Sequence, residues 1–271
     1  MTEPFFDRLG ARIEDVGSPL CVGLDPDPAR LPPAVQDADL PRLAFTRRIV
    51  EATHEHAAAY KPQVAYFEDA DGWRALRETI DCAHDHGVPV VLDAKRGDIG
   101  TTAQQYATHL DRADAITVNP YLGEDSLAPF LDRTDAGVFV LCRTSNPGGA
   151  DLQDLALAEG DRFYERVADL AARWDRHGTV GLVVGATAPA ELRSLRNRVP
   201  ALPFLVPGVG AQGGDVEAAA THAPAAEGAA AGVGLVNSAR SIIFAGEDGD
   251  GDFFEAAGEA ARDLAGSLAT A

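Results

Sequence analysis

Two lysines are the residues with the clearest chemical potential, because every other basic side chain among the 23 is an arginine. Lys61 follows the apolar segment AAAY, and Lys95 lies in VVLDAKRGDIGTTAQQYA, two residues after Asp93. An ammonium can give up its proton, whereas a guanidinium stays charged under essentially all conditions. The lysines therefore indicate a site that needs a compact positive charge or a proton that can be transferred.

Both lysines follow short apolar runs that are typical of buried strands in a parallel sheet. Segments with helical periodicity, such as the one containing Trp73, Leu76 and Ile80, separate these runs. We predict a single (β/α)8 barrel domain over residues 1–271, with a doubly wound open sheet as the alternative. The eight runs are 20–24, 57–60, 88–92, 115–118, 138–141, 180–184, 204–206 and 233–236.

Active sites of such barrels lie at the C-terminal ends of the strands. Residues two apart on a strand project to the same side, so Asp93 and Lys95 should point together into the barrel mouth. Lys61 should end the neighbouring strand. The alternative is an ion pair that only covers the barrel rim, but a surface pair contributes little and could use the arginine favoured elsewhere. Asp98 lies further along, in the following loop, where it could also be an ordinary loop carboxylate or a helix N-cap.

Glycine-rich segments follow the seventh and eighth predicted strands. The seventh leads into PGVGAQGGD, which contains Gly208, Gly210 and Gly213, and the eighth leads into NSARS, which contains Arg240. Loops at these two places commonly bind a phosphate through backbone N–H groups and helix N-termini. We expect a phosphomonoester site with Arg240 as a bidentate donor. The three glycines also match G-x-G-x-x-G, but a dinucleotide site would be expected on the first βαβ unit.

The overall charge excludes several classes of partner. With 42 acidic and 23 basic residues, the net charge is −19, which disfavours binding to nucleic acids and to anionic membranes. The N-terminal sequence lacks signal-peptide features, and no run is long enough to span a bilayer, so we expect a cytoplasmic protein. An acidic, lysine-poor surface suits high salt and indicates a halophilic host. His54, His56, His84 and His86 have a spacing that separates their rings on helices, and we expect solvated side chains.

The run LDAKRGDIGTTAQQYA, with its D-x-K-x-x-D core at Asp93, Lys95 and Asp98, resembles orotidine 5′-phosphate decarboxylase in its longer form. The resemblance extends to GLDPDP, YKPQVAYFE, RTSNPGG, VPGVGAQGGD and VNSARSIIFA, which follow one another in the right order across the barrel. It implies conversion of orotidine 5′-phosphate to UMP and carbon dioxide, the last step of UMP synthesis, without cofactor or metal.

The same resemblance implies roles for individual residues. Lys95 would be the proton donor, in a charged array with Lys61, Asp93 and Asp98. Asp98 and Thr102 would come from the neighbouring subunit of a homodimer with shared active sites. The implied substrate-binding residues are Asp25 for the ribose hydroxyls, Ser145 for the pyrimidine edge, and Gln212 and Arg240 for the phosphate.

Three other functions use similar residues. A related sugar-phosphate decarboxylase or synthase would work with a magnesium ion, and a Schiff-base aldolase would use Lys95 as a nucleophile. A non-catalytic phosphate-ligand-binding barrel would bind a nucleotide without turnover, but it leaves both lysines unexplained.

Overall fold

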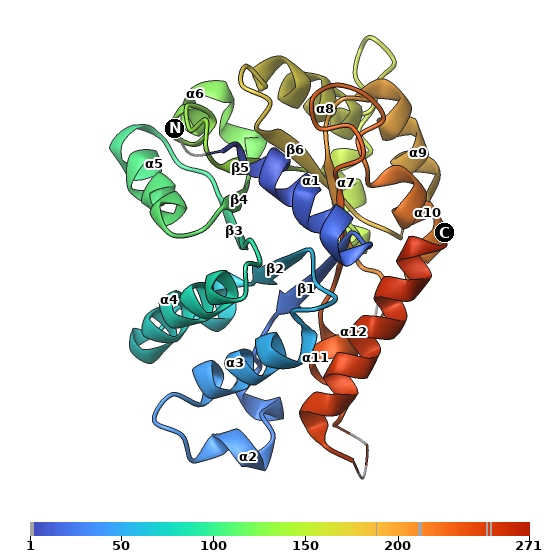
Figure 1. The fold of residues 1–271 in the computed structure, drawn as a ribbon. Coiled ribbons are helices and arrows are strands. Elements are labelled where there is room, and N and C mark those ends of the chain that lie inside the picture. The colour runs from blue at the N-terminus through green and yellow to red at the C-terminus, as the bar shows by residue number, and fades with distance from the viewer. Residues whose placement is uncertain (1–2, 188, 211–212, 248, 250) are drawn as a thin grey trace.

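The computed structural model describes residues 3–187, 189–210, 213–247, 249 and 251–271. Eight parallel strands within these residues form one sheet that curls into a nearly closed barrel surrounded by helices (Figure 1). The predicted (β/α)8 barrel is therefore confirmed, and the open doubly wound sheet is not the fold. The strands are β1 (Leu20–Leu24), β2 (Ala59–Pro62), β3 (Val91–Arg96), β4 (Ala115–Val118), β5 (Gly137–Arg143), β6 (Val180–Val184), β7 (Phe204–Pro207) and β8 (Leu235–Ser238).

Helices follow the strands and turn their apolar faces toward the sheet. In α8, for example, Tyr164, Val167 and Ala171 are buried at helical spacing. The helices are α1 (Phe5–Val16), α2 (Pro33–Gln36), α3 (Pro41–Thr53), α4 (Ala70–Asp85), α5 (Gly100–Ala107), α6 (Glu124–Leu131), α7 (Ala150–Gln153), α8 (Phe163–Trp174), α9 (Pro189–Arg198), α10 (Val216–His222), α11 (Arg240–Ile243) and α12 (Phe253–Ala269). Among the described residues, no helix combines the length and the apolar character needed to cross a membrane.

Three strands, β1, β4 and β6, coincide with the predicted runs, whereas the other five extend further toward the chain's C-terminus. The run at 88–92 predicted the start of β3 too early, because Val91 is the first residue paired with β4, opposite Ala115. The strand then continues through polar residues to Arg96, which pairs with Val118. Backbone pairing at the barrel mouth thus sets the strand ends, rather than the apolar character of the side chains.

The barrel closes at a seam between β2 and β3, which are the two ends of the strand order. Backbone contact there consists of isolated bridges, Tyr60 with Val90 and Gln63 with Asp93. The Tyr60 N–H donates to the Pro89 carbonyl at 2.9 Å. Side-chain hydrogen bonds from Lys61 and Gln63 to Asp93 also cross this seam.

Helix α1 covers the N-terminal end of the barrel, where it crosses in front of the strands in Figure 1. Phe5 and Phe6 are buried and contact the Phe139 ring edge-on, with centroid distances of 6.3 and 5.7 Å. A Cβ at Gly137, the first residue of β5, would lie 2.3 Å from the Phe5 ring, so the glycine allows this close approach. The helix fills one end of the barrel with aromatic side chains and leaves the substrate cavity to the other end.

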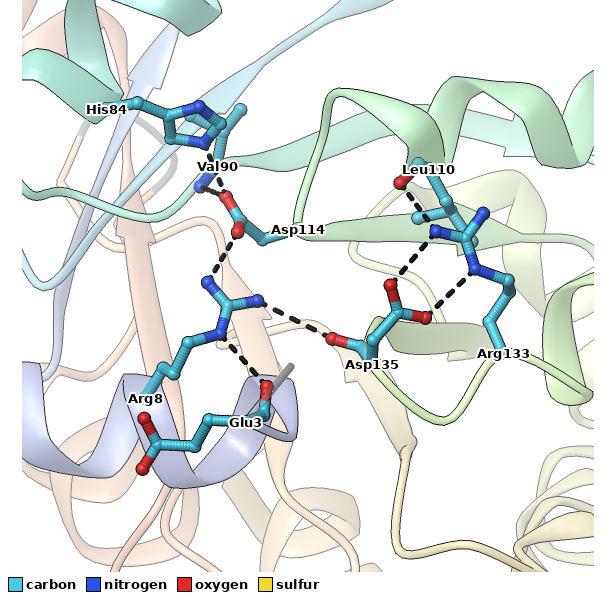
Figure 2. Close-up of polar contacts among 8 residues, drawn as sticks. All are labelled: Glu3, Arg8, His84, Val90, Leu110, Asp114, Arg133 and Asp135. Atoms are coloured by element: carbon cyan, nitrogen blue, oxygen red, sulfur yellow. Dashed lines mark hydrogen bonds and ion pairs between the residues drawn. The ribbon is translucent and has the colours of Figure 1, made fainter. Parts of the chain in front are cut away.

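Asp114, directly before β4, ties α1 and α4 to this end of the barrel (Figure 2). Its Oδ1 accepts from Arg8 at 2.6 Å, and its Oδ2 accepts from the Val90 N–H at 2.8 Å and lies 2.7 Å from His84 Nε2. The hydrogen bond to Asp114 raises the pKa of His84. His84 is exposed, as expected, but its ring is held by Asp114. The His54 ring, after α3, packs against the His86 ring, after α4, with a centroid distance of 4.5 Å and an interplanar angle of 41°.

Candidate active site

A cavity of about 300 Å³ opens at the C-terminal ends of the strands. Apolar side chains from β5, β6 and β7 line one wall, and charged side chains from β1, β2 and β3 line another. The predicted site residues among its lining are Asp25, Lys61, Asp93, Lys95, Ser145, Gly208 and Arg240. The fold therefore brings together residues that are more than 200 positions apart in the sequence.

Asp93 is the centre of the charged wall. Its Oδ2 accepts from Lys61 Nζ at 2.8 Å and from Gln63 Nε2 at 3.0 Å, and its Oδ1 accepts from Lys95 Nζ at 2.6 Å and from Thr117 Oγ1 at 2.9 Å. Burial would raise the pKa of this carboxyl, but the two ammonium groups outweigh burial and hold the pKa well below its usual range. Asp93 is thus a permanently ionised carboxylate with a fixed orientation.

The two lysines differ in their surroundings. The Lys61 side chain is only 5% exposed, and the Lys95 side chain is 46% exposed. Desolvation disfavours the charged form of Lys61, yet Asp93 and Asp25 more than compensate and raise its pKa above the usual value. Lys61 is therefore a fixed positive charge within the wall, whereas Lys95 presents its ammonium to the cavity.

Asp25 follows β1 and carries a buried oxygen, Oδ1, that has no hydrogen-bond partner among the described residues. Burial raises the pKa of this carboxyl, although Lys61 opposes the shift. A buried acceptor without a donor is costly, and it lies on the cavity wall. The arrangement suits a ligand that donates hydroxyl groups to this oxygen.

Glycines on both sides of residues 211–212 hydrogen-bond to one another after β7. The Gly213 N–H donates to the Gly210 carbonyl at 2.8 Å, and the Gly214 N–H donates to the Gly208 carbonyl at 3.0 Å. Gly210 has a φ of +88°, and a Cβ there would lie 2.5 Å from Ser241 Oγ, so a side chain would be both strained and obstructed. Gly208 and Arg240 line the cavity together, whereas Gly210 and Gly213 do not touch it. Gln212 lies outside the described residues.

Asp98 and Thr102 do not line the cavity of their own chain. Asp98 Oδ1 accepts from the adjacent Ile99 N–H at 2.8 Å, and Thr102 is exposed in the first turn of α5. Ile99 itself is the N-cap of that helix, so Asp98 is not. The adjacent apolar side chain of Ile99 is 62% exposed.

Five polar residues of the cavity lining were not singled out in the sequence analysis: Gln63, Thr117, Thr144, Asn146 and Asn237. Gln63 lies two positions after Lys61, so the rule that paired Asp93 with Lys95 could have identified it. Thr117 lies inside an apolar run, and Asn237 ends another, where its Nδ2 donates to the Cys21 carbonyl at 2.9 Å. Nothing in their local sequence distinguishes them from ordinary strand residues.

Comparison with known proteins decides the family. The family model for orotidine 5′-phosphate decarboxylase / HUMPS matches residues 18–250. The chain belongs to this family. Curated relatives include orotidine 5′-phosphate decarboxylases of Halorubrum lacusprofundi and Haloarcula marismortui, both 65% identical with 96% of each chain covered. The resemblance inferred from the motifs is therefore confirmed.

Solved structures agree with this family assignment. The OMP decarboxylase of Leishmania donovani is 42% identical, with a TM-score of 0.80 over 99% of this chain and 100% of that chain. The UMP synthase of the same organism is 45% identical, with a TM-score of 0.82, and this chain spans 56% of its length.

Proposed function

We propose that the protein decarboxylates orotidine 5′-phosphate to UMP and carbon dioxide, as the last step of UMP synthesis, without metal or cofactor. The observation that carries the proposal is the alternation of charge along Lys61, Asp93 and Lys95 on one wall of the cavity. The family's curated relatives that are named orotidine 5′-phosphate decarboxylase support the same reaction.

Lys95 is the proposed proton donor. Loss of carbon dioxide from C6 of the pyrimidine leaves an electron pair in the ring plane, where the π system cannot delocalise it. An ammonium fixed beside C6 stabilises this developing negative charge and then transfers a proton to the carbon, so the C6–H bond replaces the broken C6–carboxyl bond. The short bond from Lys95 Nζ to Asp93, at 2.6 Å, supports a fixed ammonium.

Asp93 is proposed to lie beside the carboxylate that leaves. Its four donors keep it ionised, so it remains negative when a second carboxylate enters the cavity. Repulsion between the two carboxylates favours departure of the substrate group, and Lys61 holds Asp93 in position.

The remaining proposed contacts bind the nucleotide. Asp25 accepts from the ribose hydroxyls, which would give its buried Oδ1 a donor. Ser145 binds the pyrimidine edge. Gln212 and Arg240 bind the phosphate together with the loop of Gly208, Gly210 and Gly213. Binding energy from the phosphate can then hold the pyrimidine in its reactive position and exclude water.

We propose a homodimer in which Asp98 and Thr102 complete the partner's active site. Their position outside their own cavity, beside the exposed Ile99, supports this assignment. A cytoplasmic location and a halophilic host fit the net charge of −19. The same charge argues against nucleic-acid and membrane partners.

The test is the ultraviolet assay for loss of orotidine 5′-phosphate by the purified protein at high salt, with and without EDTA. We expect turnover that EDTA does not diminish. Turnover abolished by EDTA and restored by magnesium would instead support the metal-dependent chemistry. A reduced adduct on Lys95 after borohydride treatment with substrate would contradict the assigned proton transfer.

A further inference from the structure

Strand β3 departs from regular geometry where it carries Asp93 and Lys95. Between the pairs Leu92–Ile116 and Arg96–Val118, three residues of β3 lie opposite a single residue of β4, Thr117. Within this irregularity Lys95 has a φ of +48°, and it is the only described residue other than glycine with a positive φ. Such a conformation persists only where the surrounding structure fixes it.

The hydroxyl of Thr117, on β4, lies inside this irregularity. Its Oγ1 accepts from the Ala94 N–H at 3.0 Å and from the Lys95 N–H at 2.9 Å. It also donates to Asp93 Oδ1 at 2.9 Å. A hydroxyl has one proton and two lone pairs, so these three bonds use its full capacity. The two amides fix the orientation of the hydroxyl, and its proton is thereby directed at the Asp93 carboxylate.

The position of Thr117 suits this function. It is 1% exposed, and its backbone is held in β4 opposite Phe139 of β5. One side chain, anchored in a regular part of the sheet, thus holds the main chain of Lys95 and the carboxylate of Asp93 at the same time. Asp93 Oδ1 in turn accepts a hydrogen bond from Lys95 Nζ. The Thr117 hydroxyl therefore fixes the backbone of Lys95 directly and its ammonium through Asp93.

We propose that Thr117 is a positioning residue that sets the direction of the Lys95 ammonium through the backbone of residues 94 and 95 and through Asp93. The inference rests on the proposed function, in which Lys95 stabilises and protonates C6. Thr117 transfers no proton to the substrate. Its hydroxyl keeps the ammonium aligned with the reacting carbon, where a displacement of about 1 Å can cost roughly 100-fold in rate.

The test compares kcat, KM and UMP affinity in variants of Thr117. Thr117→Val keeps the shape and removes the hydroxyl, and we expect kcat to fall about 10- to 100-fold with UMP affinity within about threefold of the wild type. Thr117→Ser and Thr117→Cys form a matched pair, because the two new side chains differ only in having a hydroxyl or a thiol group. We expect Thr117→Ser to keep most of kcat and Thr117→Cys to lose at least about tenfold, since a thiol is a weak hydrogen-bonding group. This pair preserves the test if Thr117→Val does not fold.

Thr79→Val is the control, because Thr79 is also 1% exposed and its hydroxyl bonds to Thr46, away from the cavity. It should lower the melting temperature without lowering kcat. The inference is overturned if Thr117→Val and Thr117→Cys keep wild-type kcat, if Thr117→Ser is as impaired as Thr117→Cys, or if UMP affinity falls as much as kcat. If the wild type shows no turnover, the proposed function is overturned and this inference with it. If the wild type, Thr117→Val and Thr117→Cys all turn over normally, only this inference is overturned.

Discussion

Removing one lysine at a time should separate catalysis from stability in the charged wall. Lys95→Ala removes an ammonium that is 46% exposed and leaves Asp93 with Lys61, Gln63 and Thr117 as donors. Lys61→Ala removes an ammonium that is 5% exposed. Asp25 and Asp93 then remain as buried carboxylates that have lost the positive charge offsetting their desolvation. The same substitution type therefore has different consequences at the two positions.

The magnitudes follow from burial and from the assigned chemistry. The partly solvated Lys95 ion pair should contribute about 0 to 1 kcal/mol to the free energy of unfolding. Breaking the buried Lys61 pair should cost about 3 to 5 kcal/mol, because a charge remains without its partner. In the assay, Lys95→Ala should lose at least about 10⁴-fold in kcat, since it removes both a preorganised positive charge and the proton donor.

Urea unfolding at constant high salt measures the stability change, and UMP titration verifies that the Lys95→Ala site still binds a nucleotide. UMP affinity should survive in this variant, because the proposed phosphate contacts lie on the loops after β7 and β8 and not on Lys95. Equal losses of unfolding free energy for the two alanine variants would refute the reasoning from burial. Substantial turnover by Lys95→Ala would refute its role as proton donor.

Three further predictions concern the assembly, the barrel base and the surface. Mixing inactive Lys95→Ala and Asp98→Ala proteins should restore about a quarter of wild-type activity, because half of the randomly formed dimers are hybrids with one intact site; subunit exchange without activity would contradict the shared site. The raised pKa of His84 means that its ion pair with Asp114 stabilises the fold below the unfolded-state pKa and is lost as the pH rises through the folded-state pKa. Its contribution to the free energy of unfolding, below about 1 kcal/mol for a side chain 39% exposed, should therefore fall as the pH rises above the ordinary histidine pKa of about 6.5, and His84→Gln should remove this dependence in urea titrations. The melting temperature should rise between about 0.1 M and about 3 M KCl, since salt screens repulsion among the 42 acidic side chains, and an unchanged melting temperature would contradict adaptation of this surface to salt.

The sequence predicted the barrel and the meeting of Lys61, Asp93 and Lys95, because apolar runs mark the strands and the polar residues that follow each run lie at the barrel mouth. It predicted the correct contact between Asp93 and Lys95 from regular strand alternation, yet the strand is irregular there, with a φ of +48° at Lys95. The contribution of Thr117 could not be predicted, since its hydroxyl acts on a different strand 22 to 24 residues away.

The side-chain contacts at the N-terminal end of the barrel could not be predicted from the sequence either. Spacing along a helix indicates which rings share a face of that helix. His84, however, is bound to Asp114 from another element, and the His54 ring packs against His86 from the end of another helix. The role of α1 as a cover for the barrel also depends on Phe139, which is 133 residues from Phe6 in the sequence. Tertiary contacts of this kind leave no local pattern.

The seam between β2 and β3 gives the charged wall a second significance. Few backbone bonds join these strands, and the bonds from Lys61 and Gln63 to Asp93 cross between them. The residues assigned to the reaction therefore also hold the barrel shut. A descendant of this protein that no longer needed the reaction could not discard the array freely, because it would first have to evolve another closure for the seam. Charged remnants of this wall should accordingly outlast the activity in such lineages.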